Sequence, residues 1–364
     1  MRIFAIADSD SSLTWASAFM GTLPGVTERE LILVEMPFVP SETQQAAALA
    51  ADRIKPLRLQ RLPLDGVLAT IRREQPDAVL IALRGPVAAA MIRMISELPV
   101  RPVMVTGLPG ISFPATRKAL AFRRQADLFV LHSRREIREF TRMSREYGWT
   151  HRFALSTLPF TEARSRSQGG DLVFAAQALI PRAREERERL KGLLVVAARA
   201  DPSRRVVIKV RTTTGEGQHH DEEASFRELV QEAQAAIAVP PNLVVSTAPM
   251  SAALDSAHGL VTVSSTASIE AISRGIPVIV LDSFGISDEL GNSVFELSGL
   301  FGDADAVIRR EFRHPEPAWL DDNYFHPADA DDVAVQLQAL VAARKQGVLP
   351  AREPARRAVG VLSP

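Results

Sequence analysis

Short apolar runs alternate with amphipathic or alanine-rich stretches along almost the whole chain of 364 residues. This alternation is typical of a parallel sheet whose strands are joined by crossover helices. In the first half, strands are predicted near residues 3–7, 31–35, 78–83, 103–106 and 128–131, and helices near 41–53, 64–74, 87–97 and 134–147. In the second half, strands are predicted at 172–175, 206–209, 243–245, 260–263 and 278–281, and helices at 182–200, 225–235, 251–257 and 268–274.

The length of the chain suits two domains better than one. The alternation stops at residues 161–170, a polar segment with a Gly-Gly pair, and then restarts. We therefore predict an α/β protein with two tandem doubly wound (Rossmann-like) domains, residues 1–160 and 171–327, facing each other across a cleft at the carboxyl ends of their sheets. A final helix within 328–345 is a candidate to pack back on the first domain. Residues 346–364, rich in Pro, Arg and Ala, are predicted to be a disordered tail.

Composition excludes several classes of function. The formal net charge is zero, which argues against general nucleic-acid binding. The chain has no cysteine, so disulfides, thiolate zinc sites and a cysteine nucleophile are excluded. No run approaches the roughly 20 apolar residues of a spanning helix. The apolar start 1–7 ends at Asp8, which favours a core strand over a signal peptide. We expect a cytoplasmic protein whose Arg-rich surfaces leave peripheral membrane contact open.

Residues 261–280 predict a buried strand, a helix and a second buried strand. The first strand is followed directly by Ser264, Ser265 and Thr266. These stand where a helix N-terminus presents unpaired N–H groups and the positive end of its dipole, an arrangement that binds phosphate without a metal. Glu270 follows about one turn into the helix. The alternative is an ordinary strand–helix–strand unit with a serine cap.

Further candidates in the second domain follow its first two strands. Gln177 comes after the first, and Lys209 and Arg211 occupy alternate positions at the end of the second. The two cations suit a phosphate leaving group, and His219 or His220 in the next loop would supply a proton. A solvated loop with incidental charge is the alternative. A third ligand at metal-site spacing is missing near the two histidines, so no metal site is expected.

In the first domain, Asp8 and Asp10 follow the first strand. Either would act as a general base toward an acceptor hydroxyl, and helix capping is an equal alternative. No Gly-x-Gly-x-x-Gly follows this strand, which disfavours a dinucleotide, and no cofactor is predicted. In the loop 106–114, Gly107 and Gly110 would let the backbone approach a ligand, although a ligand-free turn is the commoner explanation.

Taken together, these features resemble a glycosyltransferase of the GT-B architecture. The stretch Val-Ser-Ser-Thr-Ala-Ser-Ile-Glu-Ala-Ile-Ser-Arg-Gly-Ile-Pro-Val at 263–278, with Lys209 and Arg211 upstream, resembles the serine-pair motif of capsule-polysaccharide Kdo transferases and bacterial sialyltransferases. In those families adjacent hydroxyls hold the phosphate of a CMP-sugar. The opening Asp-Ser-Asp-Ser at 8–11 and the whole-chain layout also resemble an uncharacterised group of bacterial glycosyltransferases. Two features depart from the motif: Lys-Val-Arg replaces a His-Pro pair, and Glu270 resembles the ribose-binding glutamate of UDP- and GDP-sugar enzymes.

The resemblance implies a metal-independent glycosyltransferase that uses a nucleotide-sugar donor. Ser264, Ser265 and Thr266 would hold the donor phosphate, with CMP-sugar favoured and UDP- or GDP-sugar as alternatives. The acceptor would be a surface-polysaccharide or glycolipid precursor bound by the first domain. Two rival functions remain: a sugar-nucleotide 2-epimerase, and a non-catalytic sugar-nucleotide-binding protein that kept the fold.

Overall fold

The computed structural model describes residues 1–36, 40–42, 45–46, 49, 58–159, 167, 169–210, 225–236 and 239–352. The chain forms two compact units. Unit 1 comprises Met1–Pro159 together with Pro327–Pro364, and unit 2 comprises Phe160–His326. The predicted linker 161–170 and the predicted helix 41–53 lie largely outside the described residues.

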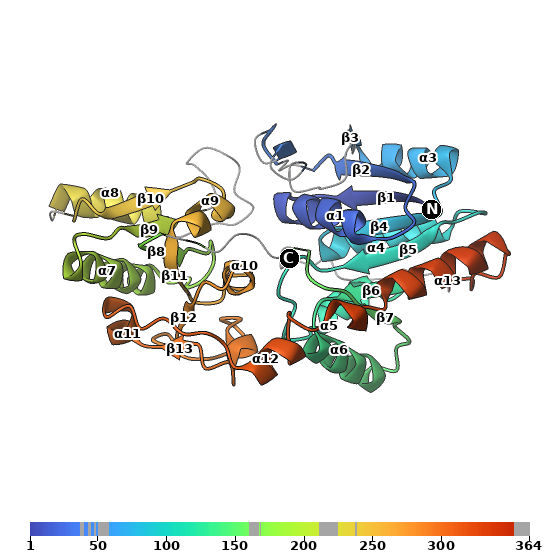
Figure 1. The fold of residues 1–364 in the computed structure, drawn as a ribbon. Coiled ribbons are helices and arrows are strands. Elements are labelled where there is room, and N and C mark those ends of the chain that lie inside the picture. Colours follow the sequence, from blue (N-terminus) through green and yellow to red (C-terminus); the bar gives the residue numbers. More distant parts are fainter. Residues whose placement is uncertain are drawn as a thin grey trace. The chain divides into compact units, whose positions relative to one another are not determined.

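Unit 1 contains a seven-stranded sheet in the order β3-β2-β1-β4-β5-β6-β7 (Figure 1). Every neighbouring pair of strands is parallel. Its strands are β1 (Arg2–Ala7), β2 (Glu28–Val34), β3 (Arg58–Leu62), β4 (Ala78–Ala82), β5 (Val103–Gly107), β6 (Leu128–Leu131) and β7 (Phe153–Leu155). Its helices are α1 (Asp10–Thr22), α3 (Leu64–Glu74), α4 (Gly85–Ser96), α5 (Arg117–Phe122), α6 (Arg134–Glu146) and α13 (Val333–Lys345), with a 3₁₀ turn η2 (Ala328–Ala330).

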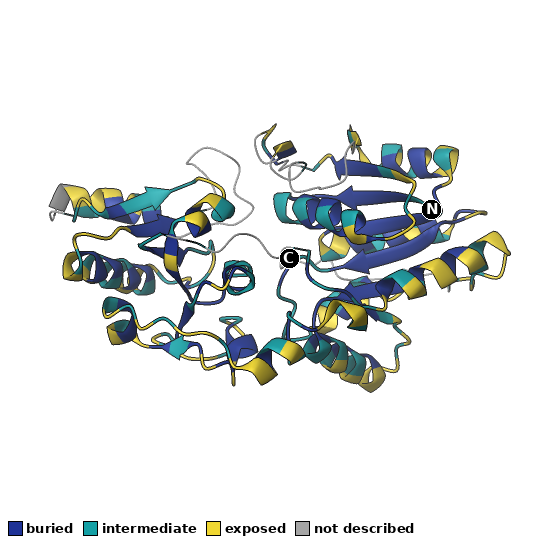
Figure 2. Ribbon diagram, in the orientation of Figure 1, coloured by how far each residue is buried: buried dark blue, intermediate teal, exposed yellow. Residues whose placement is uncertain are grey.

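The central strands of unit 1 are buried along their whole length (Figure 2). They consist mainly of Val, Ile, Leu, Ala and Met, because helices cover both faces of a parallel sheet. On one face, Phe4 and Ile81 of the sheet pack with Ile71 of α3 and Met91 of α4. On the other face, α1 buries Trp15 and Phe19. This packing fixes the strands, so the loops at their carboxyl ends start from fixed positions.

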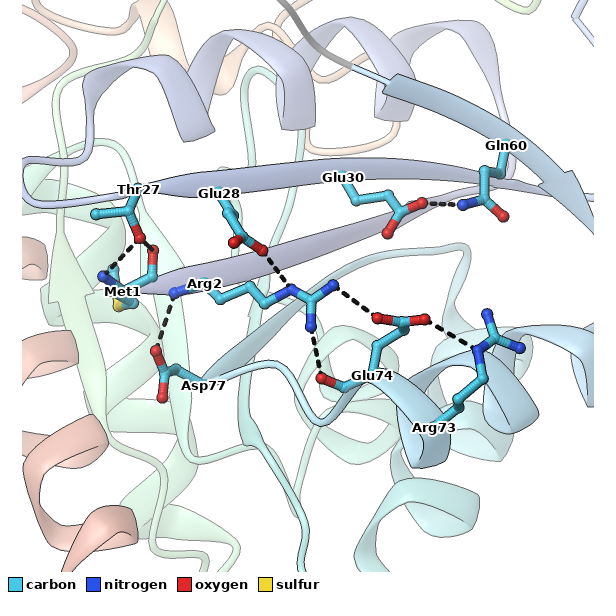
Figure 3. A network of polar contacts seen from close by, with 9 residues as sticks. All are labelled: Met1, Arg2, Thr27, Glu28, Glu30, Gln60, Arg73, Glu74 and Asp77. Carbon is cyan, nitrogen blue, oxygen red and sulfur yellow. Dashed lines mark hydrogen bonds and ion pairs between the residues drawn. The ribbon is translucent and has the colours of Figure 1, made fainter.

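Charged side chains at the amino edge of this sheet are bound to one another (Figure 3). The Arg2 guanidinium lies 2.7 Å from the Glu28 carboxylate and 2.8 Å from that of Glu74. It also donates to the Glu74 carbonyl at 2.7 Å, while the Arg2 N–H donates to Asp77 at 2.9 Å. These bonds join β1, β2 and the end of α3, so the charged residues at this edge stabilise the fold.

Unit 2 contains a six-stranded parallel sheet in the order β10-β9-β8-β11-β12-β13 (Figure 1). Its strands are β8 (Asp171–Ala175), β9 (Val206–Lys209), β10 (Leu243–Ser246), β11 (Ala257–Thr262), β12 (Val278–Leu281) and β13 (Phe301–Gly302). Its helices are α7 (Arg184–Ala200), α8 (Phe226–Ala236), α9 (Met250–Asp255), α10 (Ala267–Ser273), α11 (Ala304–Ile308) and α12 (Pro317–Asp322), with a 3₁₀ turn η1 (Ser293–Phe295). Side chains of α7, α8 and α11 share one core with the sheet.

The last helix, α13, lies in unit 1 against β5, β6 and β7. Residues 346–352 follow it and were expected to belong to a disordered tail, but they make contacts instead. Arg101 Nη2 donates to the Pro350 carbonyl at 2.6 Å, and Arg352 Nε donates to Asp127 at 3.1 Å. A buried carboxylate, Asp127, thus binds a segment that composition alone predicted to be disordered.

The predicted fold class is confirmed: both units are Rossmann-like, with one parallel sheet each. Most predicted strands agree with the observed ones to within a few residues, whereas β3, β7 and β13 were missed. No helix within the described ranges combines the length and apolar character needed to cross a membrane.

Candidate functional site

Each sheet has one place where the strand order reverses. In unit 2 the first strand, β8, lies between β9 and β11, and in unit 1 the first strand, β1, lies between β2 and β4. The crossovers on the two sides of such a strand run in opposite directions, so a crevice opens at the carboxyl ends. Ligands of open α/β sheets bind in this crevice, the topological switch point. The candidate sites are therefore the loops after β8 and β11 and those after β1 and β4.

Gln177 and Ser264 meet across the switch point of unit 2. The Ser264 N–H donates to Gln177 Oε1 at 3.0 Å. The Ser264 hydroxyl lies 3.1 Å from Nε2 and 3.2 Å from Oε1 of the same amide. Gln177 follows β8, and Ser264 follows β11. The structure therefore brings together two residues that the sequence predicted separately.

The next two residues, Ser265 and Thr266, lead into α10. Ser265 N–H donates to Thr262 Oγ1 at 3.0 Å, and Ser265 Oγ accepts from the Ala267 N–H at 3.2 Å. Thr266 is the N-cap residue, and its side chain makes no capping hydrogen bond. Ser265 thus provides part of the serine cap that the sequence offered as an alternative, because its hydroxyl accepts from a backbone N–H at the start of α10. Helix α10 has only seven residues, and the N–H groups of Ser264, Ser265 and Ala267 already have acceptors within the unit.

A loop after β12 also reaches the serines and was missed in the sequence. Gly291 has φ +67°, and a Cβ added there would lie 3.6 Å from Ser264 Oγ. Asn292 is fully buried and fixes this loop. Its Oδ1 accepts from the Ser287 N–H, and its Nδ2 donates to the Gly285 carbonyl, both at 2.9 Å. The only sequence signal was two glycines, at 285 and 291, the second directly followed by Asn292, after an apolar strand.

Arg187 of α7 is a second residue that sequence reasoning missed. It is almost fully buried and lies with its guanidinium 5.3 Å from the centroid of Phe226. It donates to the carbonyls of Pro181 at 2.9 Å and Gln177 at 3.0 Å, and also to that of Ala178. Arg187 therefore fixes the loop that carries Gln177. Nothing distinguishes it among the arginines of the segment 182–189.

Other predicted donor-site residues have different surroundings. Lys209 is buried at the end of β9, level with Ala175 of β8, and its Nζ donates to the Val210 carbonyl. Glu270 lies 2.8 Å from Arg274, which is itself 2.8 Å from Asp255, so Glu270 belongs to an ion-pair network within unit 2. Arg211, His219 and His220 lie outside the described residues.

Asp8 and Arg84 meet across the switch point of unit 1. Asp8 is fully buried, and its Oδ2 accepts from both the Arg84 N–H and Nε at 3.0 Å. Its Oδ1 has no hydrogen-bond partner among the described residues. The Arg84 side chain is 44% exposed. This geometry makes Asp8 a buried anchor for the Arg84 guanidinium.

Arg123 adds a second cation beside this pair. Its Nη2 donates to the Leu83 carbonyl at 2.9 Å, and its Nε donates to Thr106 Oγ1 at 3.2 Å. Burial lowers the pKa of Arg123 to about 10, and the charge of Asp8 opposes this shift. The guanidinium therefore stays protonated at neutral pH. Arg123 fixes the loop that carries Arg84 in the way that Arg187 fixes the loop of Gln177.

The helix cap after β1 is Ser9, whose side chain accepts from the Ser12 N–H at 3.3 Å. Asp10 is the half-exposed first residue of α1. Its carboxylate is therefore nearer to solvent than that of Asp8.

Glycine is favoured for different reasons at the two predicted positions of the acceptor-side loop. A Cβ at Gly107 would lie 2.4 Å from the ring of Trp15, so glycine is required there by packing. Trp15 Nε1 in turn donates to His132 Nε2 at 2.8 Å. Gly110 has φ +85°, a conformation that favours glycine. The predicted close approach of a ligand is therefore not needed to explain Gly107.

Comparison with known families gives the class of protein. The family model described as "Putative glycosyltransferase (DUF6716)" matches residues 3–340, so the chain belongs to this family. No curated protein matches the sequence. No three His, Asp or Glu side chains in the described part of the chain come together as a metal site requires.

Several solved structures share the fold. The S. aureus MnaA–UDP structure is 12% identical with a TM-score of 0.60, covering 97% of this chain and 99% of that one. A UDP-N-acetylglucosamine 2-epimerase is 12% identical with a TM-score of 0.53, covering 95% and 96%. The UDP-GlcNAc 2-epimerase from Neisseria meningitidis bound to UDP-GlcNAc is 11% identical with a TM-score of 0.50, covering 95% and 100%. These likenesses show the fold, which is of the GT-B type. The resemblance to Kdo transferases and sialyltransferases stays a prediction.

Proposed function

We propose that this protein transfers a sugar from a nucleotide-activated donor, bound at the switch point of unit 2, to a surface-polysaccharide or glycolipid precursor in the cytoplasm. The observation that carries the proposal is the Gln177–Ser264 contact, at 3.0 to 3.2 Å, across the carboxyl ends of β8 and β11. Family membership supports the reaction class.

The donor phosphate would be held by neutral groups. The hydroxyls of Ser264, Ser265 and Thr266 would donate to its oxygens, and Gln177 would orient the first of them. Lys209 lies one strand away and would offset the charge that develops on the departing nucleotide. Arg211 and the pair His219 and His220 keep the roles that the sequence suggested. With cations from side chains, the proposed reaction does not require a metal.

On the acceptor side, Asp10 is the better candidate for the general base. Asp8 is fully buried and bound to Arg84, so an acceptor hydroxyl would not reach it without displacing that pair. Asp10 is half-exposed in the first turn of α1. A general base must lie within hydrogen-bond reach of the proton that it removes.

Nucleotide preference is tested by a thermal-shift panel of CMP, CDP, UDP and GDP, because a ligand that binds the native state raises its melting temperature. We expect CMP to raise the melting temperature most, and UDP and GDP are the alternative nucleotides. A protein that is stabilised by none of the four would contradict the proposal.

A second candidate function is sugar-nucleotide 2-epimerisation, favoured by the two epimerase structures that share the fold over 95% of this chain. An epimerase needs no acceptor. Incubation with the preferred nucleotide-sugar alone, followed by NMR of the products, separates the two. A changed sugar with the nucleotide still attached indicates epimerisation, and sugar transfer only in the presence of an acceptor indicates the proposed function. Tight nucleotide binding with neither product would indicate a non-catalytic binding protein.

A further inference from the structure

Two stacked aromatic rings beyond the end of α6 are each in contact with an arginine guanidinium. The rings of Tyr147 and Trp149 have centroids 4.9 Å apart and planes 24° apart. The guanidinium of Arg117 lies 5.3 Å from the centroid of Tyr147, and that of Arg124 lies 5.9 Å from the centroid of Trp149. We call these four residues the arginine–aromatic patch. They belong to unit 1, where none of them contributes to the Asp8–Arg84 pair.

Three of the four residues of the patch are exposed, Trp149 is half-buried, and the neighbouring chain carries further cations. Tyr147 is 44% exposed, and both arginines are exposed. Lys118 and Arg145, also exposed, are close to the patch in the chain. Within the described residues, Arg117, Lys118 and Arg145 have no ion-pair partner. The nearby Glu146 is already bound to Arg142 at 2.6 Å. A chain with zero net charge thus has a local excess of cations here.

Rings with a polar tip, surrounded by cations, suit the boundary between water and an anionic bilayer. Tyr and Trp place an apolar body toward lipid and a polar group toward water. Lys and Arg are attracted by the negative surface potential of anionic lipids. The structural alternative is that the cation–π contacts hold α5 against the end of α6. That role explains neither the exposure of Tyr147 nor the three cations without an ion-pair partner.

We propose that the arginine–aromatic patch docks unit 1 on the surface of a bilayer that contains anionic phospholipids. The proposal does not depend on the donor site. Binding through a few charges and two rings is reversible, as for a peripheral protein.

The test is co-sedimentation of the full chain with two kinds of vesicle, phosphatidylcholine alone and phosphatidylcholine mixed with phosphatidylglycerol. We expect binding to the mixed vesicles only, weakened as salt rises from about 0.1 M to about 0.5 M because screening shortens the reach of the charges. Arg117→Gln should lower the partition coefficient about fivefold. Tyr147→Ala should also lower it.

The matched control is Arg189→Gln in unit 2, which removes another exposed arginine that lies over a ring, 5.4 Å from the centroid of Phe284. It should bind like the wild type. Equal binding to both kinds of vesicle, or equal losses for Arg117→Gln and Arg189→Gln, would overturn the proposal. All variants should keep the nucleotide-induced thermal shift, so failure here is distinguishable from failure of the donor site.

Discussion

The pair at the switch point of unit 1 is charged, with a fully buried carboxylate, whereas the pair in unit 2 is an amide and a hydroxyl. In unit 1 the Asp8 carboxylate accepts two hydrogen bonds and fixes a guanidinium. In unit 2 Gln177 and Ser264 are neutral groups that can donate to an incoming oxygen. A phosphate at the first pair would meet the buried Asp8 carboxylate together with the cations Arg84 and Arg123, whereas a phosphate at the second pair would meet neutral donors. The same topology thus gives two chemically different sites, and our proposal assigns the donor phosphate to the neutral one in unit 2.

The largest difference between the two pairs is expected in how much each one stabilises its own unit. Arg84→Met takes the guanidinium and its positive charge away from the buried Asp8 carboxylate, which then keeps the backbone N–H of residue 84 as its donor. We expect unit 1 to lose about 2–3 kcal/mol, below the range for fully buried pairs because Arg84 is partly exposed. Hydrogen exchange of the β1 and β4 amides measures this locally, which is needed because a chain of two units need not unfold in one step.

The double variant Asp8→Asn/Arg84→Met is the control for this prediction. Because it removes the buried charge as well, it should be less destabilised than the sum of the two single changes. A loss below about 0.5 kcal/mol in Arg84→Met would show that the pair is not the anchor described here.

A smaller effect is expected at the neutral pair. Gln177→Leu leaves the Ser264 N–H without its acceptor, at a cost of about 1 kcal/mol. The measurement is hydrogen exchange of the β8 and β11 amides in unit 2. Gln231→Leu, at an exposed position of α8, is the matched control and should change little. If both variants behave alike, the contact across β8 and β11 is dispensable for stability.

The smallest effect concerns pH and is confined to unit 1. Burial lowers the pKa of His151, an effect that the nearby Arg124 reinforces and the Leu120 carbonyl opposes. The unfolded chain therefore binds a proton at a higher pH than the folded unit does. Stability from this group is complete above about pH 6.5 and falls as the pH drops below that value. His151→Gln should reduce the difference in unfolding free energy between about pH 5.5 and about pH 7.5. An unchanged difference would exclude His151 as its source.

The central strands could be predicted because burial on both faces demands continuous apolar runs. The three strands that were missed, β3, β7 and β13, are all edge strands. Strand β3 reads Arg-Leu-Gln-Arg-Leu and is nowhere fully buried, and β13 has only two residues. Such segments pair with the sheet on one side only and carry no long apolar run; β7 is only the three residues Phe-Ala-Leu.

The candidate site was predictable only in part, for a related reason. Residues directly after strands, such as Asp8, Gln177 and Ser264, follow from the rule that ligands bind at carboxyl ends. Their partners do not: Arg84, Arg123 and Arg187 belong to an Arg-rich composition in which tertiary packing alone decides which arginines bind these loops. The role of Gly107 was likewise hidden, because the ring of Trp15 that requires it is far away in sequence.

The most direct test of the central claim is calorimetric titration with the nucleotide that gives the largest thermal shift. Ser264→Ala/Ser265→Ala should raise the Kd of that nucleotide about 10-fold to 30-fold, because two hydrogen bonds to the phosphate are lost. The matched serine pair in unit 1, Ser9→Ala/Ser12→Ala, should leave Kd unchanged although it removes the cap of α1. An unchanged Kd in the Ser264/Ser265 variant, or an equal loss in both variants, would contradict a phosphate site at the switch point of unit 2.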